Sequence, residues 1–167
     1  MSHLDQLVVS LSNPAIRWTY LPEGKRKKDT MKRAIQTRHE LNAPSNKVWD
    51  LIKTGEKWED WFPILTGSKI ENNIRYCELG DGKVLEERFL SSDAEQIFIY
   101  AVDRQNAFPA SDIVGTIRLE AKDQQTTLHW TVEMTPQSEE VFPALQEMIH
   151  EMYTASAEKL EALANQN

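Results

Sequence analysis

The chain has 167 residues and a formal net charge of −7; 40% of its residues are hydrophobic and five are tryptophan. This length fits one domain with enough apolar side chains for a sizeable core. The negative charge and an isoelectric point near 5.1 oppose binding to phosphate backbones, so nucleic acid is not an expected partner. A single cysteine, Cys77, precludes an internal disulfide.

The sequence shows no sign of membrane insertion or secretion. No apolar run approaches the roughly 20 residues of a membrane span. The apolar segment at residues 7–11 is too short for a secretory signal, and no basic region precedes it. We therefore expect a cytoplasmic protein and no membrane insertion.

Residues 1–30 differ from the rest of the chain, because turn-forming residues at 13–14 and 22–24 and a KRKKD run interrupt any long periodicity. We expect an N-terminal extension here, ahead of a folded domain at residues 31–167. The codons for GKRKKD would be purine-rich, like a bacterial ribosome-binding site upstream of Met31, so one hypothesis makes Met31 the natural start. A genuine tail, poorly ordered or with a small helix over residues 4–11 that docks on the body, is the alternative.

The domain is expected to begin with a strand at residues 32–41, followed by two short helices. In the first helix the pattern VWDLI has helical spacing, Pro44 is tolerated at a helix start, and Ser45 can bond to free amides there. The second helix gathers Trp58, Trp61 and Phe62. Three large rings exceed what a short plug needs, so we expect some to line the mouth of a cavity; simple end packing is the alternative.

Six further strands are predicted, with spacings typical of an antiparallel meander. Asn72-Asn73 suits a tight hairpin, residues 80–82 tolerate positive φ, and Asp123-Gln124 suits a polar turn. The expected strands are residues 65–71, 74–79, 84–91, 96–104, 113–120 and 126–135.

A long helix at residues 138–164 closes the chain, with Ser138 as its expected N-cap and two glutamates in its first turn. Met148 and Met152 sit centrally on its apolar stripe, where flexible side chains suit an adaptable pocket. The stripe comprises Phe142, Leu145, Met148 or Ile149, Met152, Ser156, Leu160 and Leu163.

The order of these segments resembles the polyketide cyclase/dehydrase-like branch of the START/Bet v 1 (SRPBCC) superfamily, from Met31 to the end of the chain. The matching series is NAPSNKVWDLI, WEDWFP, RYCELGDGKVLEERFL, IYAVDRQNAFPASDIVGTIRLE, TTLHWTVEM and the closing helix. No single piece is specific, but their order is.

The resemblance implies an α+β helix-grip fold, in which a seven-stranded antiparallel sheet wraps around the long C-terminal helix. It also implies a cavity gated by the loop at residues 105–111, with Phe108 and Pro109 forming one lip. It does not imply one activity, because the superfamily includes lipid carriers, receptors, cyclases and quinone-binding proteins. Its hairpin pattern places Arg75, Cys77 and Leu79 opposite Leu85, Glu87 and Phe89 across the pocket.

Alternation along the strands predicts the side chains that face the cavity. Trp130 is the inward choice on the last strand, with Leu128 and Val132. Ile113, Gly115 and Ile117 form an inward set, in which Gly115 leaves room for a ligand or a neighbouring ring. On the strand before it Phe98, Tyr100 and Val102 alternate, but Ile97 and Ile99 are apolar too, so both faces of that strand could be covered.

Arg75 and Glu87 would then lie in an apolar enclosure, where pairing offsets the cost of burying each charge alone. In the functional interpretation they orient a polar group of a hydrophobic ligand. A purely structural ion pair, or a register shifted by one residue that turns both outward, is the alternative.

No catalytic constellation emerges from the titratable residues. Glu87, His39 and His129 are the only candidates on strands for acid-base work, and none has a convincing partner. Cys77 is interpreted as a buried small hydrophobe, reactive only if Arg75 lowers its pKa. The histidines and acids lack metal-ligand spacing, so we expect no metal and no cofactor.

Our interpretation is a protein that binds or transports a small hydrophobic molecule: a lipid, isoprenoid, quinone or polyketide. The alternatives are a cyclase or dehydratase in which Glu87 or Tyr100 moves a proton, and a partner-binding protein with a closed cavity and a surface apolar patch. Whether it forms a homodimer is left open. The expected ligand-binding residues are Trp58, Trp61, Phe62, Arg75, Glu87, Phe89, Tyr100, Pro109, Ile113, Gly115, Trp130, Met148 and Met152.

Overall fold

The computed structural model describes residues 31–166, so the expectations for residues 1–30 lie outside the described part of the chain. One antiparallel sheet has the strand order β1-β7-β6-β5-β4-β3-β2. Its strands are β1 Arg33–Leu41, β2 Leu65–Glu71, β3 Ile74–Leu79, β4 Val84–Ser92, β5 Ile97–Gln105, β6 Ala110–Lys122 and β7 Gln125–Pro136. The helices of this part are α1 Ser45–Ile52 and α2 Phe142–Ala164, with 3-10 turns η2 Trp58–Asp60, η3 Gly80–Gly82 and η4 Glu139–Val141.

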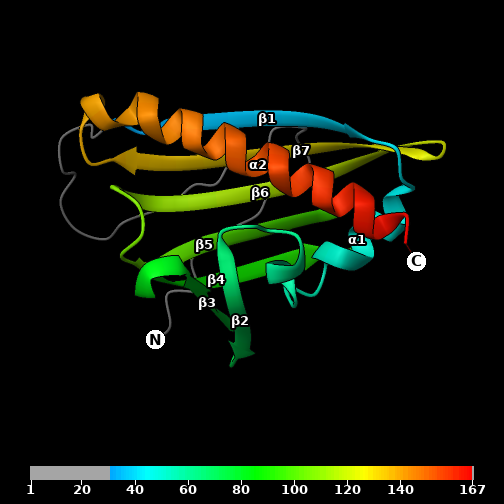
Figure 1. Ribbon diagram of the computed structural model, residues 1–167, viewed down its shortest axis with the longest axis horizontal. Coiled ribbons are helices and arrows are strands. Elements are labelled where there is room, and N and C mark those ends of the chain that lie inside the picture. Colours follow the sequence, from blue (N-terminus) through cyan, green and yellow to red (C-terminus); the bar gives the residue numbers. More distant parts are fainter. Residues whose placement is uncertain (1–30, 167) are drawn as a thin grey trace. The chain divides into compact units, whose positions relative to one another are not determined.

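The long helix α2 lies across the sheet over β1 and β7, and its C-terminal end lies beside α1 (Figure 1). This is the helix-grip arrangement expected from the sequence, with the core between the sheet and the helix. Within the described residues no helix is both long and apolar enough to cross a membrane.

The hairpin turns use residues that tolerate a left-handed backbone. Asn72 and Asn73 have φ of 52° and 62° between β2 and β3, as a two-residue type I′ turn requires. Asp81 and Gly82 have φ of 64° and 70°, and Asp123 has φ of 53° in the turn between β6 and β7. The three predicted turns are therefore confirmed.

The segment after β1 contains one helix and one 3-10 turn rather than two helices. Val48, Trp49 and Ile52 form the buried face of α1. The predicted second helix is only the 3-10 turn η2, because the backbone leaves helical geometry at Trp61, with φ of −130°, and Pro63 disfavours helical backbone at the residue before it.

Strand β6 is longer than predicted, because its pairing with β7 continues past an irregularity between Ser111 and Val114. Asp112 takes a φ of 52° there, so the strand bends and then resumes pairing at Ala110. Strand β5 carries buried side chains on both faces, since Ile97 and Ile99 are buried as well as Phe98 and Tyr100.

The closing helix begins in two steps. Ser138 has the extended backbone of an N-cap, but its side chain makes no capping hydrogen bond, and the 3-10 turn η4 precedes α2. The apolar stripe of α2 passes through Ile149 and not Met148, which is 37% exposed. Adjacent helical residues point about 100° apart, so only one of the two can face the sheet.

Candidate functional site

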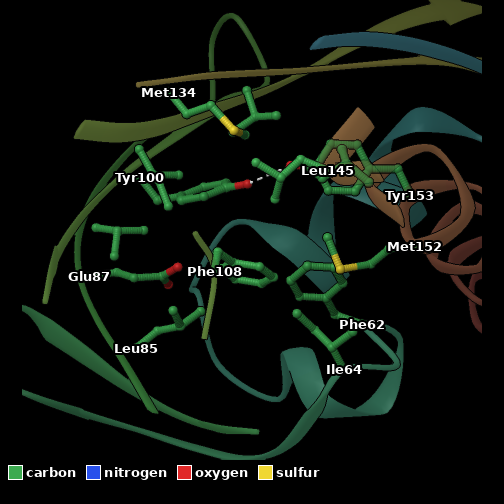
Figure 2. A pocket seen from close by; sticks show the side chains of 14 residues that line it. Phe62, Ile64, Leu85, Glu87, Tyr100, Phe108, Met134, Leu145, Met152 and Tyr153 are labelled. Carbon is green, nitrogen blue, oxygen red and sulfur yellow. Dashed lines mark hydrogen bonds between the residues drawn. The ribbon is translucent and has the colours of Figure 1, made fainter. Parts of the chain in front are cut away.

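A small space remains open between the concave face of the sheet and α2. Its volume is about 40 Å³, which is enough for water but not for a ligand of ordinary size. Figure 2 shows the side chains around it. The sheet contributes Leu85, Glu87, Tyr100, Val102, Ile113, Val132 and Met134; α2 contributes Leu145, Ile149, Met152 and Tyr153; connecting segments contribute Phe62, Ile64 and Phe108.

Glu87 is the only charged residue of this lining, and its partner is Arg75. The strand register places the two directly opposite each other on β3 and β4. Nε and Nη2 of Arg75 both donate to Oε2 of Glu87, at 2.9 and 2.6 Å. Arg75 and Glu87 are only 1% and 4% exposed, so the predicted inward register and pairing are both present.

The guanidinium of Arg75 is enclosed by rings. Its Cζ lies 3.7 Å from the ring centroid of Trp58, and Phe98 and Phe89 lie further out. Nη1 also donates to the backbone oxygen of Gly55 at 3.3 Å. The cation is thus held behind Glu87, and the carboxyl group is the part of the pair that borders the cavity.

Tyr100, Tyr153 and Trp130 form a second buried polar group. Trp130 Nε1 donates to Tyr100 Oη at 3.1 Å, and the two phenol oxygens lie 3.1 Å apart. The rings of Trp130 and Tyr153 stack with their centroids 3.7 Å apart. Burial raises the pKa of Tyr100 to about 12 and raises the pKa of Tyr153 well above its usual value.

The missing side chain of Gly115 is what allows Tyr100 to lie there. A Cβ at residue 115 would sit 1.9 Å from Cζ of Tyr100. Of the two alternatives for the space at Gly115, the neighbouring ring is therefore the one observed.

Trp58 and Trp61, both expected ligand-binding residues, do not line the cavity and instead pack as an end cap. Each is 1% exposed, and their ring centroids are 4.6 Å apart. Their indole nitrogens donate to backbone oxygens of Ile52 and Leu51, so they fasten η2 to α1. Only Phe62 of the cluster reaches the cavity lining.

Six further expected residues lie outside the lining, and three of them, Met148, Pro109 and Phe89, do not support it from behind either. Met148 faces away on α2, and Pro109 is exposed, where its backbone oxygen accepts a hydrogen bond from Gln137. Phe89 stacks on Phe98 with centroids 5.2 Å apart, on the Arg75 side of the core. The structure thus brings Phe62, Glu87, Tyr100, Ile113 and Met152 together around the space, and Arg75, Gly115 and Trp130 support them from behind.

Phe108 reaches the cavity from the loop between β5 and β6, where its ring extends toward the other lining side chains (Figure 2). The side chain of Gln105 fixes this loop: Nε2 donates to the oxygens of Phe108 and Ala110 at 3.0 and 2.8 Å. Its Oε1 accepts from the backbone nitrogens of Ala107 and Phe108, both at 2.7 Å. Gln105 therefore makes four of the hydrogen bonds that hold the loop around Phe108, and Gln137 N adds one to the oxygen of Pro109.

Sequence reasoning missed Tyr153, Met134 and Ile64 as lining residues. Tyr153 could have been found, because it lies four residues after Ile149 on the same face of α2. Ile64 lies in a connection without periodicity, where the sequence carries no comparable signal.

The remaining titratable candidates have ordinary surroundings. Burial, with Glu87 nearby, raises the pKa of the Cys77 thiol to about 12, so it stays protonated. His129 Nε2 lies 3.2 Å from Oε2 of Glu120. The pKa of His39 is lowered, mainly by burial and to a smaller extent by the nearby His150. Across residues 31–166, no group of three or more His, Cys, Asp or Glu side chains is placed to hold a metal ion.

Comparison with known proteins gives one family. A family model described as polyketide cyclase / dehydrase and lipid transport matches residues 32–165. Among proteins with curated descriptions, none matches the chain.

Solved structures show the same fold at low sequence identity. The Zhui aromatase/cyclase from Streptomyces sp. R1128 is 15% identical with a TM-score of 0.71, over 81% of this chain and 95% of that one. A START superfamily protein from Mycobacterium smegmatis is 14% identical with a TM-score of 0.68, over 80% and 97%. The protein XoxI from Bacillus cereus is 23% identical with a TM-score of 0.69, over 77% and 93%. These likenesses confirm the START/Bet v 1-like fold.

Proposed function

Since the chain belongs to the polyketide cyclase/dehydrase and lipid transport family, we propose that it binds a small hydrophobic molecule between the sheet and α2. The lining is the observation that carries this proposal. Apart from Glu87, every side chain around the space is aliphatic, aromatic or methionine. Ligand sites are lined in this way, by apolar groups with a few polar ones that fix orientation. A lipid, isoprenoid, quinone or polyketide-like molecule fits this chemistry.

Binding requires the space to enlarge. A volume of about 40 Å³ compares with roughly 300–1,000 Å³ for typical ligand pockets. Phe108 is the side chain best placed to move, because it enters from a loop whereas the other rings of the lining belong to strands, α2 or the segment after η2. Met134 and Met152 have flexible side chains that can adapt to a ligand. We infer that a ligand takes the place of the Phe108 ring.

Titration with the neutral fluorophore N-phenyl-1-naphthylamine tests the proposal. If the ring of the half-buried Phe108 must leave its apolar site, Phe108→Ala removes a cost of about 1 kcal/mol. The probe should then bind that variant about fivefold more tightly than the wild type. Absence of saturable binding in both proteins would contradict the proposal.

Two substitutions on α2 form a matched pair. Met152→Trp adds volume inside the cavity and should weaken probe binding to Phe108→Ala, whereas Met148→Trp adds it on the exposed side of the same helix and should not. Circular dichroism melting checks that both variants fold. An equal loss of probe affinity in the Met152→Trp and Met148→Trp variants would show that the probe binds outside the cavity.

The enzymatic alternative, a cyclase or dehydratase, has less support from the site. General acid-base catalysis works best with a pKa near the operating pH. Burial raises the pKa values of Tyr100 and Tyr153 further above neutral pH, away from this optimum. Turnover of a polyketide-like substrate would be needed to favour it.

The partner-binding alternative was expected to show a closed cavity and a surface apolar patch. The small volume agrees with the first feature. Among the described residues, however, the exposed large apolar side chains are scattered. Met31 lies ahead of β1, Val84 and Leu90 lie well apart along β4, and Met148 lies on α2. Scattered side chains of this kind are normal on a protein surface. A cytoplasmic location and the absence of a nucleic-acid partner stay predictions, and homodimer formation stays an open possibility.

A further inference from the structure

One oxygen at the cavity has no donor. All hydrogen bonds to the Glu87 carboxyl group go to Oε2, from Arg75 and from the Cys77 thiol at 3.6 Å. No described residue donates to Oε1. Since Glu87 lines the cavity and its side chain is 5% exposed, this oxygen is a hydrogen-bond acceptor set in an apolar wall. Leaving such an acceptor unpaired is unfavourable, so a donor on a ligand gains a strong site there.

One hydroxyl hydrogen at the cavity has no acceptor. Tyr100 and Tyr153 together carry two hydroxyl hydrogens, and a single contact between their oxygens uses one of them. The indole nitrogen of Trp130 donates to Tyr100 and cannot accept a hydrogen bond, so it does not pair with either hydroxyl hydrogen. Within residues 31–166 the second hydroxyl hydrogen meets no acceptor. Both tyrosines line the cavity, which therefore offers a donor as well as an acceptor.

The charge at the wall selects against anions. Arg75 is committed to Glu87, Gly55 and the ring of Trp58, and it does not border the cavity. A ligand carboxylate would face the free oxygen of Glu87 with no cation to compensate it, and two like charges in an apolar site repel strongly.

We propose that the ligand is a neutral hydrophobic molecule with a hydroxyl group, which donates to Oε1 of Glu87, and with an oxygen that accepts from the tyrosine pair. This inference rests on the proposed function and makes it more specific. Phenols, sterol-like alcohols and hydroxylated polyketides belong to this class; free fatty acids do not.

Three ring-matched probes test the inference at pH 7: neutral 2-naphthol, naphthalene, and anionic 2-naphthoate. Their dissociation constants are measured for the Phe108→Ala protein, in which the space is larger. A hydrogen bond to a charged acceptor predicts about tenfold or more tighter binding of 2-naphthol than of naphthalene, and 2-naphthoate should be the weakest. Equal binding of 2-naphthol and naphthalene, or tightest binding of 2-naphthoate, overturns the inference while hydrophobic binding stands. Failure of all three overturns the proposed function as well.

Adjacent glutamates of β4 provide the matched variants, each made in the Phe108→Ala protein. Glu87→Gln removes the charge at the cavity, whereas Glu86→Gln removes one that pairs with Arg104 at the surface. The preference for 2-naphthol over naphthalene should fall at least about threefold in the first and stay unchanged in the second. Because Glu87→Gln leaves Arg75 unpaired, the double variant Arg75→Met/Glu87→Met, which removes both charges, should show the same loss of preference. A preference that survives in the double variant overturns the role of Glu87.

Discussion

Arg75 is a cation at the centre of an apolar core, and its stability there depends on Glu87. The substitution Arg75→Met keeps much of the volume but leaves a buried carboxylate alone. We expect it to lower the free energy of unfolding by about 3–5 kcal/mol, as breaking a buried pair does. The double variant Arg75→Met/Glu87→Met should recover most of this loss, because no charge remains buried. Urea denaturation measures both, and a double variant no more stable than the single one would contradict the argument.

The absence of a side chain at Gly115 makes room for the ring of Tyr100, and substitution by alanine tests this. In Gly115→Ala the new Cβ overlaps the Tyr100 ring, so the ring must move and its hydrogen bonds to Trp130 and Tyr153 must change. Overpacking of this kind costs about 1–3 kcal/mol of unfolding free energy. The control Gly80→Ala meets nothing within 4 Å and should change stability little. Equal effects of the two in thermal melts would remove the special role of Gly115.

The buried thiol of Cys77 and the buried phenol of Tyr100 predict that the protein loses stability at alkaline pH. The folded pKa of Cys77 is raised from 9.0 to about 12 and that of Tyr100 from 10.0 to about 12, both mainly by burial. The folded state therefore keeps protons that the unfolded state releases, so this stability is complete below about pH 9 and is lost as the pH rises toward 12. The urea midpoint should be lower at pH 10.5 than at pH 8. Cys77→Ala should show a smaller decrease, and a midpoint independent of pH would contradict the prediction.

Single residues also show what the sequence can predict. The pairing of Arg75 with Glu87 follows from strand alternation and from the cost of burying a lone charge, and both are visible in the sequence. The sequence does not show which of Met148 and Ile149 faces the sheet, because both are apolar. The rotation of α2 about its axis in the packed structure decides this. From the sequence, Trp58 and Trp61 could equally pack against α1 or line the opening of the cavity. Their indole hydrogen bonds to backbone oxygens of α1 show that they pack against the helix.

Among the elements, the loop between β5 and β6 controls the cavity through Gln105. In Gln105→Ala the amides of Ala107 and Phe108 lose their acceptor, so their hydrogen exchange should accelerate about tenfold or more. N-phenyl-1-naphthylamine should also associate faster, because Phe108 is no longer fixed. The control is Gln137→Ala, since that residue contacts the loop through its backbone nitrogen. Unchanged exchange in Gln105→Ala would show that other contacts hold the loop.

Element by element, the hairpins were predictable because turn chemistry is local. Asn72-Asn73 and Asp123 identify their turns, and the bounds of β2 and β3 agree with the expected ones. The extra length of β6 was not predictable, because it depends on a left-handed residue, Asp112, within a strand. The second short helix ends after a single turn, because the backbone leaves helical geometry at Trp61, shortly before Pro63.

At the scale of the whole domain, the sequence determines the architecture but not the size of the cavity. Element order and apolar patterning are enough to place α2 against a seven-stranded sheet. The space left between them depends on how rings from distant segments meet, such as Phe62, Phe108 and Tyr153. It also depends on the loop that positions Phe108. These are properties of packing, and no pattern in the chain encodes them directly.

The methionine methyl groups provide the most direct test of a ligand site between the sheet and α2. Met134 and Met152 line the cavity, whereas Met31 and Met148 are exposed outside it. In a protein labelled with 13C-methyl methionine and titrated with 2-naphthol, we predict saturable shifts of the Met134 and Met152 signals and unchanged signals for Met31 and Met148. Shifts confined to Met148 or Met31, or no shift at any methionine in both the wild type and Phe108→Ala, would contradict the account.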